Sequence, residues 1–406
     1  MTDDKSSRLP LPLGEFIALL AWLMAMTALS IDIMLPALPA IAKTYAVANE
    51  NDRQLIVASY LMGMAGGQLV WGHISDRLGR RIPLLAGLAV YTISAVAALL
   101  SPTFQSLIFA RVIQGFGGAA ARTLGTAIVR DVFAGREMAR TMSFVMMVFI
   151  MVPVLAPSIG QLLLAYGDWR WCFMALVLSG LIAMLWVTIR LPETSKSKVS
   201  GVQSTTSFWR SVRTVLGNPV THSYGLAAGL TFGCLVTYIS SAQQIFVDIY
   251  GLGHLFPLAF GGIAVSMAVA AFTNSQLVLR LGMRRLSHLA LVAFVIVSIT
   301  LALICLAGTP PLSVTLICLG LSFYLFAIIQ SNFNAIAMHP IGHVAGMGAS
   351  LLGAFVTFCG VVLGGAIARS FDGTLLPLAV GFALLGSCAL VVILLHEGPR
   401  GMFRGE

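Results

Sequence analysis

The sequence predicts an all-α integral membrane protein with twelve transmembrane helices in two pseudo-symmetric six-helix halves. Of its 406 residues, 58% are hydrophobic and only 10% are charged, and the mean hydropathy is +0.93. Soluble globular chains are nearer half apolar and a quarter charged. This composition excludes a disordered chain, a nucleic-acid-binding protein and an ordinary cytosolic enzyme, and it indicates that lipid is the main solvent of the chain.

Twelve apolar stretches are long enough to cross a bilayer, which takes about 20 residues. They lie at roughly 15–38, 54–75, 83–101, 104–129, 141–165, 169–189, 219–244, 255–278, 286–307, 311–337, 344–369 and 374–395. They must be helices, because a lone strand cannot satisfy its backbone hydrogen bonds in hydrocarbon. The first stretch is not a cleaved signal peptide, since it is too long and carries Asp32.

The placement of Lys and Arg predicts that both termini are cytoplasmic. Of the 24 such residues, 18 fall in the tails, loops and linker on one side, 4 fall on the other side and 2 lie within the fourth span. Positive charge accumulates on the cytoplasmic side of membrane proteins. We therefore expect a multi-pass protein of the cell inner (plasma) membrane, and this placement explains the net charge of +9 without a nucleic-acid partner.

A polar stretch divides the chain into two halves. Residues 191–218 are rich in Ser, Thr and Lys and predict a flexible cytoplasmic linker between an N-terminal half, 1–190, and a C-terminal half, 219–406. The basic sequence RLGRR at 77–81 recurs as RLGMRR at 280–285, an offset of 203 residues. Two related halves predict a transport pathway between them, with a midplane site open to each side in turn.

The short loop after the second span carries the strongest local pattern of the chain, GHISDRLGRRIPL from Gly72 to Leu84. A tight turn between antiparallel helices needs glycine, and Asp76 can neutralise an arginine or meet a helix N-terminus. The residues that we assign to this inside-loop gating motif are Gly72, Asp76, Arg77, Gly79, Arg80 and Arg81. The plainer alternative is that the arginines only fix the topology.

The fourth span carries a polar stripe. Arg111 and Arg122 are 11 residues apart and therefore lie about 20° apart on a helix, and Gln114, Gly115 and Gly118 share this stripe. Charges inside a membrane face a cavity or a partner and mark a pathway. Structural bonding between helices is the alternative, and Arg122 lies close enough to the inner end to extend its charge to the interface.

Asp32 is the only acidic residue well inside a predicted span, at a depth similar to that of Arg111. Burial penalises the charged carboxylate, whereas a nearby guanidinium favours it. This competition predicts that the two residues form a proton switch. The alternative is a static ion pair between Asp32 and Arg111.

Two further groups of residues are candidates for a gate and for substrate contact. Pro153, Pro157 and Gly160 predict a bend in the fifth span, which serves either as a gate or only in packing. Aromatic and amide groups suit a large, mainly apolar ligand, although helix packing is their commoner role. The candidates for substrate contact are Tyr60, Tyr238, Gln243, Tyr324 and Asn332.

Several chemistries have no basis in the sequence. The six cysteines lie in apolar runs without CxxC spacing, and the seven histidines lie at or near span ends, so we expect neither a disulfide nor a metal site. There is no P-loop and no HExxH motif, so we expect no enzyme, no cofactor and no ATP-driven pump. The energy for transport should then come from an ion gradient, and a buried Asp near an Arg favours protons.

These motifs resemble those of the major facilitator superfamily, and specifically the twelve-span drug:proton antiporters of the Bcr/CflA drug-resistance group. The loop at 72–84 is similar to the G-x-L-a-D-r-x-G-r-k motif, and the fourth span to l-x-x-R-x-x-q-G. Further resemblance lies in SIDIMLPALP at 30–39, APSIG at 156–160, DWRWCF at 168–173 and LPET at 191–194. It covers nearly the whole first half, whereas the second half matches mostly in hydropathy.

The resemblance implies export of lipophilic drugs driven by proton entry, in a monomer whose partners are a small lipophilic substrate, protons and the bilayer. Asp32 would be the protonated residue and Arg111 would tune it. Asp76 would dock against the inner end of the eleventh span, and Arg80 would pair with Asp131. The chain departs from the fifth-span antiporter motif at three glycine positions, which hold Val152, Ala156 and Gln161.

Other functions stay open on the sequence alone. An exporter of a small metabolite, such as an amino acid, a sugar or a siderophore, would need more charged or amide groups in its cavity. A transporter-like receptor would need a sizeable soluble appendage, whereas the tails have roughly 14 and 11 residues. Arg122 belongs to no motif that we can match.

Overall fold

The computed structural model describes residues 11–133, 135–195 and 208–401, and every regular element in these ranges is a helix. The first half holds α1 (Leu13–Asp32), η2 (Leu35–Ala37), α2 (Leu38–Thr44), η3 (Glu50–Gln54), α3 (Leu55–Leu78), α4 (Arg81–Leu99), α5 (Phe104–Val132), α6 (Gly135–Tyr166) and α7 (Arg170–Arg190). After α9 (Phe208–Gly217), the second half holds α10 (Pro219–Gln243), η4 (Gln244–Ile249), η5 (Gly253–Leu255), α11 (Phe256–Leu281), α12 (Met283–Ala307), α13 (Leu312–Met338), η6 (His339–Val344), α14 (Ala345–Arg369) and α15 (Leu376–Gly401).

The predicted set of membrane-crossing helices is present in this structure. Eleven helical segments of the described ranges are long and apolar enough to span a bilayer. The remaining long helix, α5, is the most polar of the long helices and packs against α1, α3 and α4. Because other helices cover much of its surface, α5 needs less apolar surface than a helix that faces lipid on most sides.

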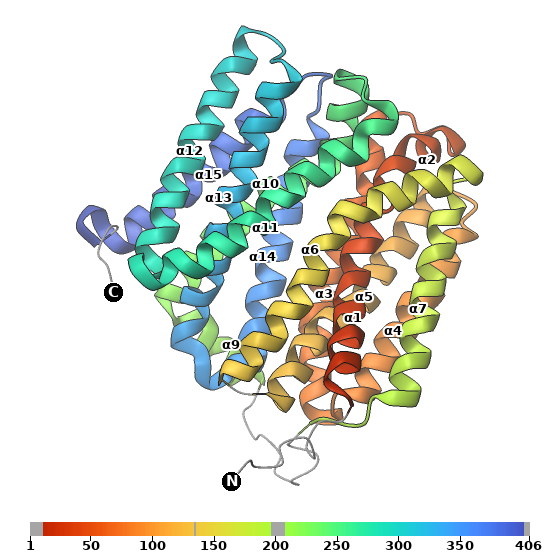
Figure 1. Cartoon of the computed structure of the whole chain (residues 1–406), viewed down its shortest axis with the longest axis vertical. Coiled ribbons are helices and arrows are strands. Elements are labelled where there is room, and N and C mark those ends of the chain that lie inside the picture. Colours follow the sequence, from red (N-terminus) through yellow and green to blue (C-terminus); the bar gives the residue numbers. More distant parts are fainter. Residues whose placement is uncertain (1–10, 134, 196–207, 402–406) are drawn as a thin grey trace.

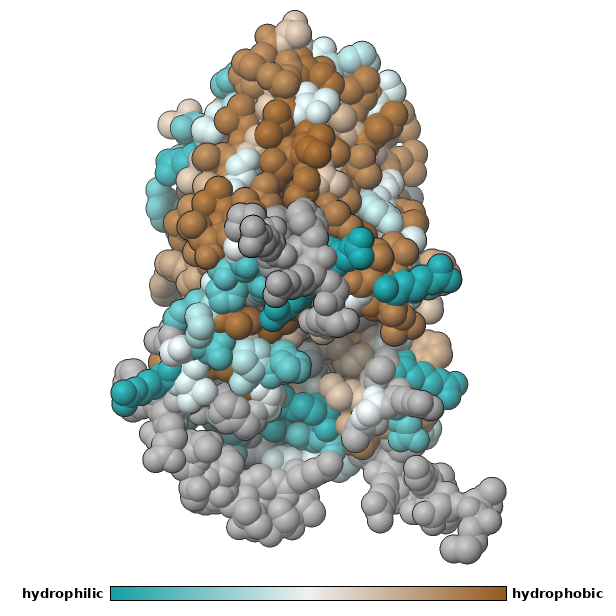
Figure 2. Space-filling view, turned by 90° about the vertical axis from the view of Figure 1, so that its left-hand side faces the viewer, coloured by the Kyte–Doolittle hydropathy of each residue, from teal (hydrophilic) through white to brown (hydrophobic). Residues whose placement is uncertain are grey.

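The two halves stand side by side, with the first half on the right and the second on the left in Figure 1. They meet along two seams, where α3 packs against α14 and α6 packs against α11. Figure 2 shows a broad hydrophobic belt on one face, with hydrophilic residues gathered below it, toward the end where α1 begins in Figure 1. We call this end, which holds the turn between α3 and α4, the basic end.

Two predicted boundaries need correction. The first span continues beyond residue 38, because α2 extends the helical segment to Thr44 after a break that contains Pro36. The predicted linker is not uniformly flexible, since α9 forms within it and packs against α14 and α10. The linker residues 196–207 lie outside the described residues.

Glycines set how closely α3 and α5 approach. A Cβ atom at Gly115 would overlap the carbonyl of Tyr60, and one at Gly63 would overlap the carbonyl of Val112. Small residues at helix interfaces allow this backbone contact in membranes. Gly115 of the predicted stripe therefore acts in packing α5 against α3, and this packing brings Tyr60 under Arg111.

Candidate functional site

Arg111 of α5 is fully buried in the first half and is held by backbone carbonyls. Its Nη2 donates to the Ser30 carbonyl at 2.9 Å and its Nε to the Ile56 carbonyl at 3.1 Å. The Ser30 carbonyl can accept this bond because α1 tightens at its end. In a regular α-helix the Met34 amide would donate to Ser30, but here it donates to the Ile31 carbonyl. Nη1 donates to Gln114 Oε1 at 2.8 Å.

An aromatic ring completes the surroundings of Arg111. Its guanidinium carbon lies 4.6 Å from the centre of the Tyr60 ring, a cation–π contact that is strong where water is excluded. Gly118 leaves room for the Tyr60 hydroxyl, which a Cβ atom at that position would crowd. The arginine thus ties α5 to α1 and α3.

Asp32 is the last residue of α1, and it is only 3% exposed. No hydrogen bond or ion pair joins its carboxylate to another of the described residues, Arg111 included. The predicted contact between Asp32 and Arg111 is therefore absent from this structure, because Arg111 is satisfied by the Ser30 carbonyl two residues earlier. Asp32 lies three residues before η2, which packs against α10 of the second half, so the carboxylate is near the seam.

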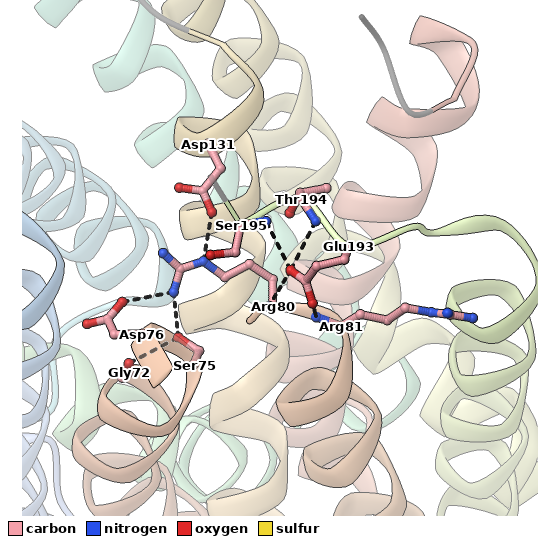
Figure 3. A network of polar contacts seen from close by, with 9 residues as sticks. All are labelled: Gly72, Ser75, Asp76, Arg80, Arg81, Asp131, Glu193, Thr194 and Ser195. Carbon is pink, nitrogen blue, oxygen red and sulfur yellow. Dashed lines mark hydrogen bonds and ion pairs between the residues drawn. The ribbon is translucent and has the colours of Figure 1, made fainter. Parts of the chain in front are cut away.

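The basic-end turn between α3 and α4 is built around Arg80, shown in Figure 3. Its Nε donates to Asp131 Oδ2 at 2.7 Å, and its Nη1 donates to Asp76 Oδ1 at 2.9 Å and to Ser75 Oγ at 2.7 Å. Burial disfavours the charged guanidinium, but the hydrogen bonds to Asp131 and Asp76 outweigh this cost and raise the pKa of Arg80. The pair of Arg80 and Asp131 that the resemblance implied is present in the structure.

Glu193, which follows α7, covers the first amides of α4 (Figure 3). Its carboxylate accepts hydrogen bonds from the backbone N–H groups of Arg80 at 2.7 Å and Arg81 at 3.3 Å. It also accepts bonds from the amides of Thr194 and Ser195. Partial burial raises the pKa of Glu193, but these four amide donors outweigh it and lower the pKa overall. The sequence identified Glu193 only as part of the LPET resemblance and not as a cap of α4.

The rest of the gating motif falls into clear roles. Gly79 has φ +88°, and a Cβ atom there would collide with the Glu193 carboxylate, so the turn requires glycine. Arg81 Nη2 donates to the Thr188 carbonyl of α7 at 2.5 Å. Arg77 is exposed, and no ion pair is found for it within the described ranges.

The same turn meets the second half at the start of α14. A Cβ atom at Gly346 would lie 3.2 Å from Arg130 Nη2 and 3.8 Å from Asp76 Oδ2. Gly72 leaves room for the Ser350 hydroxyl. Asp76 therefore docks against the basic end of α14, the eleventh span, as the resemblance implied.

A cavity of about 400 Å³ lies above this contact, between α3 and α5 of the first half and α10, α13 and α14 of the second. Its polar lining residues include Gln68, Asp76, Arg80, Arg122, Arg130, Gln330 and Asn334, and its apolar lining residues include Leu124, Phe232, Met338, Leu352 and Val356. The side chain of Arg122 is exposed and lines this cavity. Arg111 and Arg122 share a stripe of α5 as predicted, but only Arg122 opens to the cavity.

The predicted substrate contacts do not line this cavity. Tyr60 lies against Arg111, and Tyr238 packs between Phe260 and Phe323. Gln243 Nε2 donates to Asp248 at 3.5 Å, Tyr324 bonds to Thr273 at 2.8 Å, and Asn332 Nδ2 donates to Asn274 at 2.7 Å. These residues were chosen by side-chain type. Tyr324 and Asn332 find partners on α11, whereas Tyr60 Oη, Tyr238 Oη and Gln243 Oε1 are buried without a hydrogen-bond partner among the described residues.

The fifth-span residues lie on α6, which packs against α1 within the first half and against α11 across the seam. Pro153 and Pro157 are inside α6, and a Cβ atom at Gly160 would overlap the Ile33 carbonyl next to Asp32. Val154 packs against Gly261 of α11. A Cβ atom built at Gly261 would lie 3.4 Å from the Val154 side chain. Gly160 therefore lets α6 contact the segment that ends α1.

A cluster at the end opposite the basic end joins the two halves, and it was not predicted from the sequence. Arg53 Nη2 pairs with Asp248 Oδ2 of η4 at 2.5 Å, and Gln54 Nε2 donates to Gln244 Oε1 at 2.5 Å. Asn51 Nδ2 donates to the carbonyls of Arg369 and Phe371. We call Asn51, Arg53, Gln54, Gln244 and Asp248 the opposite-end clasp. The available signal was Arg53, one of four cations placed on the outer side, which proves to be buried.

Known proteins agree with this architecture. The family model described as Major Facilitator Superfamily matches residues 20–364. The chain belongs to the major facilitator superfamily. It is thus a multi-pass membrane protein and a secondary transporter that moves a small substrate, and not an enzyme.

Relatives of this transporter are known from bacteria. The chain is 30% identical to the uncharacterized MFS-type transporter YdgK of Bacillus subtilis, over 93% of this chain and 96% of the relative. It is 27% identical to the bicyclomycin resistance protein homolog of Haemophilus influenzae, over 94% of this chain and 95% of the relative. The fold is similar to that of the partially occluded inward-open xylose transporter XylE from E. coli, with a TM-score of 0.75, 13% identity and coverage of 94% and 97%.

Proposed function

We propose that this transporter exports lipophilic drugs or antibiotics in exchange for protons, with Asp32 as the residue that takes up and releases the proton. The observation that carries the proposal is the position of Asp32, a buried carboxylate near the seam with no partner among the described residues. An unpaired carboxylate inside a membrane is costly when charged, so it favours proton uptake. The relative named for bicyclomycin resistance supports a drug as the cargo.

The proposed coupling runs through the end of α1. Arg111 donates a hydrogen bond to the Ser30 carbonyl and so holds the last turn of α1 in place. Asp32 follows two residues later, so protonation of Asp32 changes the charge beside this turn. Protonation from outside then favours the outward state that releases the drug, and loss of the proton to the inside resets it. The halves 1–190 and 219–406 would rock against each other along the α3–α14 and α6–α11 seams, in a monomer of the inner membrane with both termini cytoplasmic.

An exporter of a small metabolite is a second candidate. It is favoured by the cavity lining, which holds more charged and amide groups than the sequence led us to expect, among them Arg122, Gln330 and Asn334. Proton coupling at Asp32 would be the same in both cases, and only the cargo would differ.

The test uses purified protein in liposomes with a pH dye inside and an imposed proton gradient. A panel of lipophilic antibiotics and dyes is added first, followed by amino acids and sugars. We expect proton movement on addition of a lipophilic compound, and its loss in Asp32→Asn, which keeps the side-chain shape but cannot exchange a proton.

Asp372→Asn is the matched control, because Asp372 is an acidic residue in the exposed turn between α14 and α15 and its role as an acceptor for Thr374 is open to Asn as well. It should exchange like the unchanged protein. Normal exchange in Asp32→Asn would show that the proton site is elsewhere. Proton movement triggered only by a metabolite would keep the coupling and replace the drug as cargo.

A further inference from the structure

Arg122 is a membrane-embedded cation whose side chain opens to the cavity. It lies ten residues before the end of α5, which is about 15 Å along the helix axis. No hydrogen bond or ion pair of its guanidinium is found with residues 11–133, 135–195 or 208–401. A charge at such a depth is expensive unless it faces water or a ligand.

The charges around Arg122 leave the cavity positive. Among the residues that the structure describes, three arginines line it, Arg80, Arg122 and Arg130, against one acidic residue, Asp76. Arg80 is already engaged by Asp76 and Asp131, and Arg130 lies beside Gly346 at the basic end. The positive charge of Arg122 is therefore available to a ligand, and low-dielectric walls strengthen its attraction for anions and its repulsion of cations.

The wall of the second half adds polar and apolar contacts. Gln330 Oε1 is buried without a hydrogen-bond partner among the described residues, and Asn334 lies one helical turn further along α13. Phe232 and Val356 supply apolar surface. A cavity of about 400 Å³ with this lining matches a small molecule that has an apolar body and a polar end.

We infer that this cavity binds amphipathic organic anions, and that Arg122 recognises their carboxylate, sulfonate or phosphate group. The inference rests on the proposed export function and narrows its substrate class. A guanidinium offers parallel N–H donors that match two oxygens of such a group. A ligand held by Arg122 would also touch Gln330 across the seam, and it would therefore link the two halves.

Binding of two probes of similar size and opposite charge tests the inference. Equilibrium binding of 2-naphthalenesulfonate and 2-naphthyltrimethylammonium is measured on the purified full chain in detergent without a proton gradient. We expect tighter binding of the sulfonate, and a loss of about 10- to 100-fold for the sulfonate in Arg122→Gln, since a hydrogen bond to a charged group has that value. Arg122→Lys should keep part of the affinity because it retains the charge without the fork of donors.

Arg140→Gln is the matched control. Arg140 is an exposed arginine of α6 outside the cavity, where it lies over the Phe144 ring. This variant should bind both probes as the unchanged protein does. Equal sulfonate affinity in Arg122→Gln and Arg140→Gln, with unchanged thermal stability, would overturn the inference, as would tighter binding of the cation.

Two further arms separate the possible outcomes. Dihexanoylphosphatidylglycerol tests a lipid headgroup as the source of the anion, and Arg122-dependent binding of this lipid with none of the sulfonate would overturn the assignment to a free organic anion. Asp32→Asn should retain sulfonate binding. If it does so while proton exchange is normal in that variant, the proposed coupling fails and the anion site stands.

Discussion

The basic-end turns of the two halves have the same backbone but different chemistry. Each turns on a glycine of positive φ, Gly79 at +88° and Gly282 at +76°. At the offset of 203 residues, Asp76, Arg80 and Asp131 of the first half correspond to Leu279, Met283 and Asn334 of the second. All three members of the ion-pair network are thus missing together from the second half.

The absence of all three charges together has an electrostatic reason. Removing one partner of a buried ion pair leaves an uncompensated charge, whereas replacing every partner by neutral groups of similar size is often neutral or stabilising. Of the arginines that the second turn keeps, Arg284 pairs with Glu397 at a longer 3.4 Å. Such a turn therefore forms without the ion pairs of the first half, which points to their contact with α14 as the reason they are present.

The largest expected effect is from breaking this network one charge at a time. Arg80→Met should lower the free energy of unfolding by about 3 kcal/mol, because it leaves Asp131 and Asp76 facing each other without a cation. The triple variant Asp76→Leu, Arg80→Met, Asp131→Asn copies the second half and should recover most of this loss. Thermal unfolding in detergent measures both.

Arg77→Met is the control for this series, since Arg77 is exposed and should lose little. A triple variant as unstable as Arg80→Met would contradict the comparison of the two turns. Recovered stability together with lost transport would indicate that the network acts in the conformational cycle.

A smaller effect is expected at the opposite-end clasp, where the contacts join the two halves. Asp248→Asn removes the charge that Arg53 meets and should shift the balance toward opening at this end by about tenfold. Labelling of Ser240→Cys by a membrane-impermeant thiol reagent, in a cysteine-free background, measures this opening, because Ser240 is buried in α10. Asp168→Asn is the control, since Asp168 pairs with Arg170 at an exposed site within the first half, and it should not change the labelling rate. An equal labelling rate in Asp248→Asn and Asp168→Asn would rule out a clasp.

The smallest expected effect is on pH dependence at Glu193. Its folded pKa lies below the usual value near 4.5, so its contribution to stability is present above that value and is lost as the pH falls through the folded pKa. Glu193→Gln should therefore be less stable than the unchanged protein by about 0.5 kcal/mol at neutral pH, after solvent screening, and the gap should close in acid.

Unfolding curves between neutral pH and acid measure this gap. Glu397→Gln serves as the counterpart, since Glu397 lies 204 residues further along and meets Arg284 rather than a helix N-terminus. A gap for Glu193→Gln that stays constant with pH would show that its charge does not stabilise α4.

The sequence predicted local features well and contacts between distant residues less well. The pairing of Arg80 with Asp131 and the docking of Asp76 were found where the family resemblance placed them, although Asp131 and α14 are distant from the turn in sequence. The contact of Arg111 with Asp32 was not found, because helical depth alone does not tell which carbonyl a guanidinium reaches. Arg53 and Asp248 are 195 residues apart, and no periodicity relates them.

By itself, the sequence determined that the chain lies in a membrane and where most of its long helices begin and end to within a few residues, and it predicted two halves. Hydrophobic run length and the placement of charge are local properties, and the bilayer leaves the backbone few alternatives. Only the tertiary structure decided which polar groups are satisfied within a half, as at Arg111, and which open to the cavity, as at Arg122. That distinction depends on which helices pack against each face of α5, and it is a property of the assembled bundle.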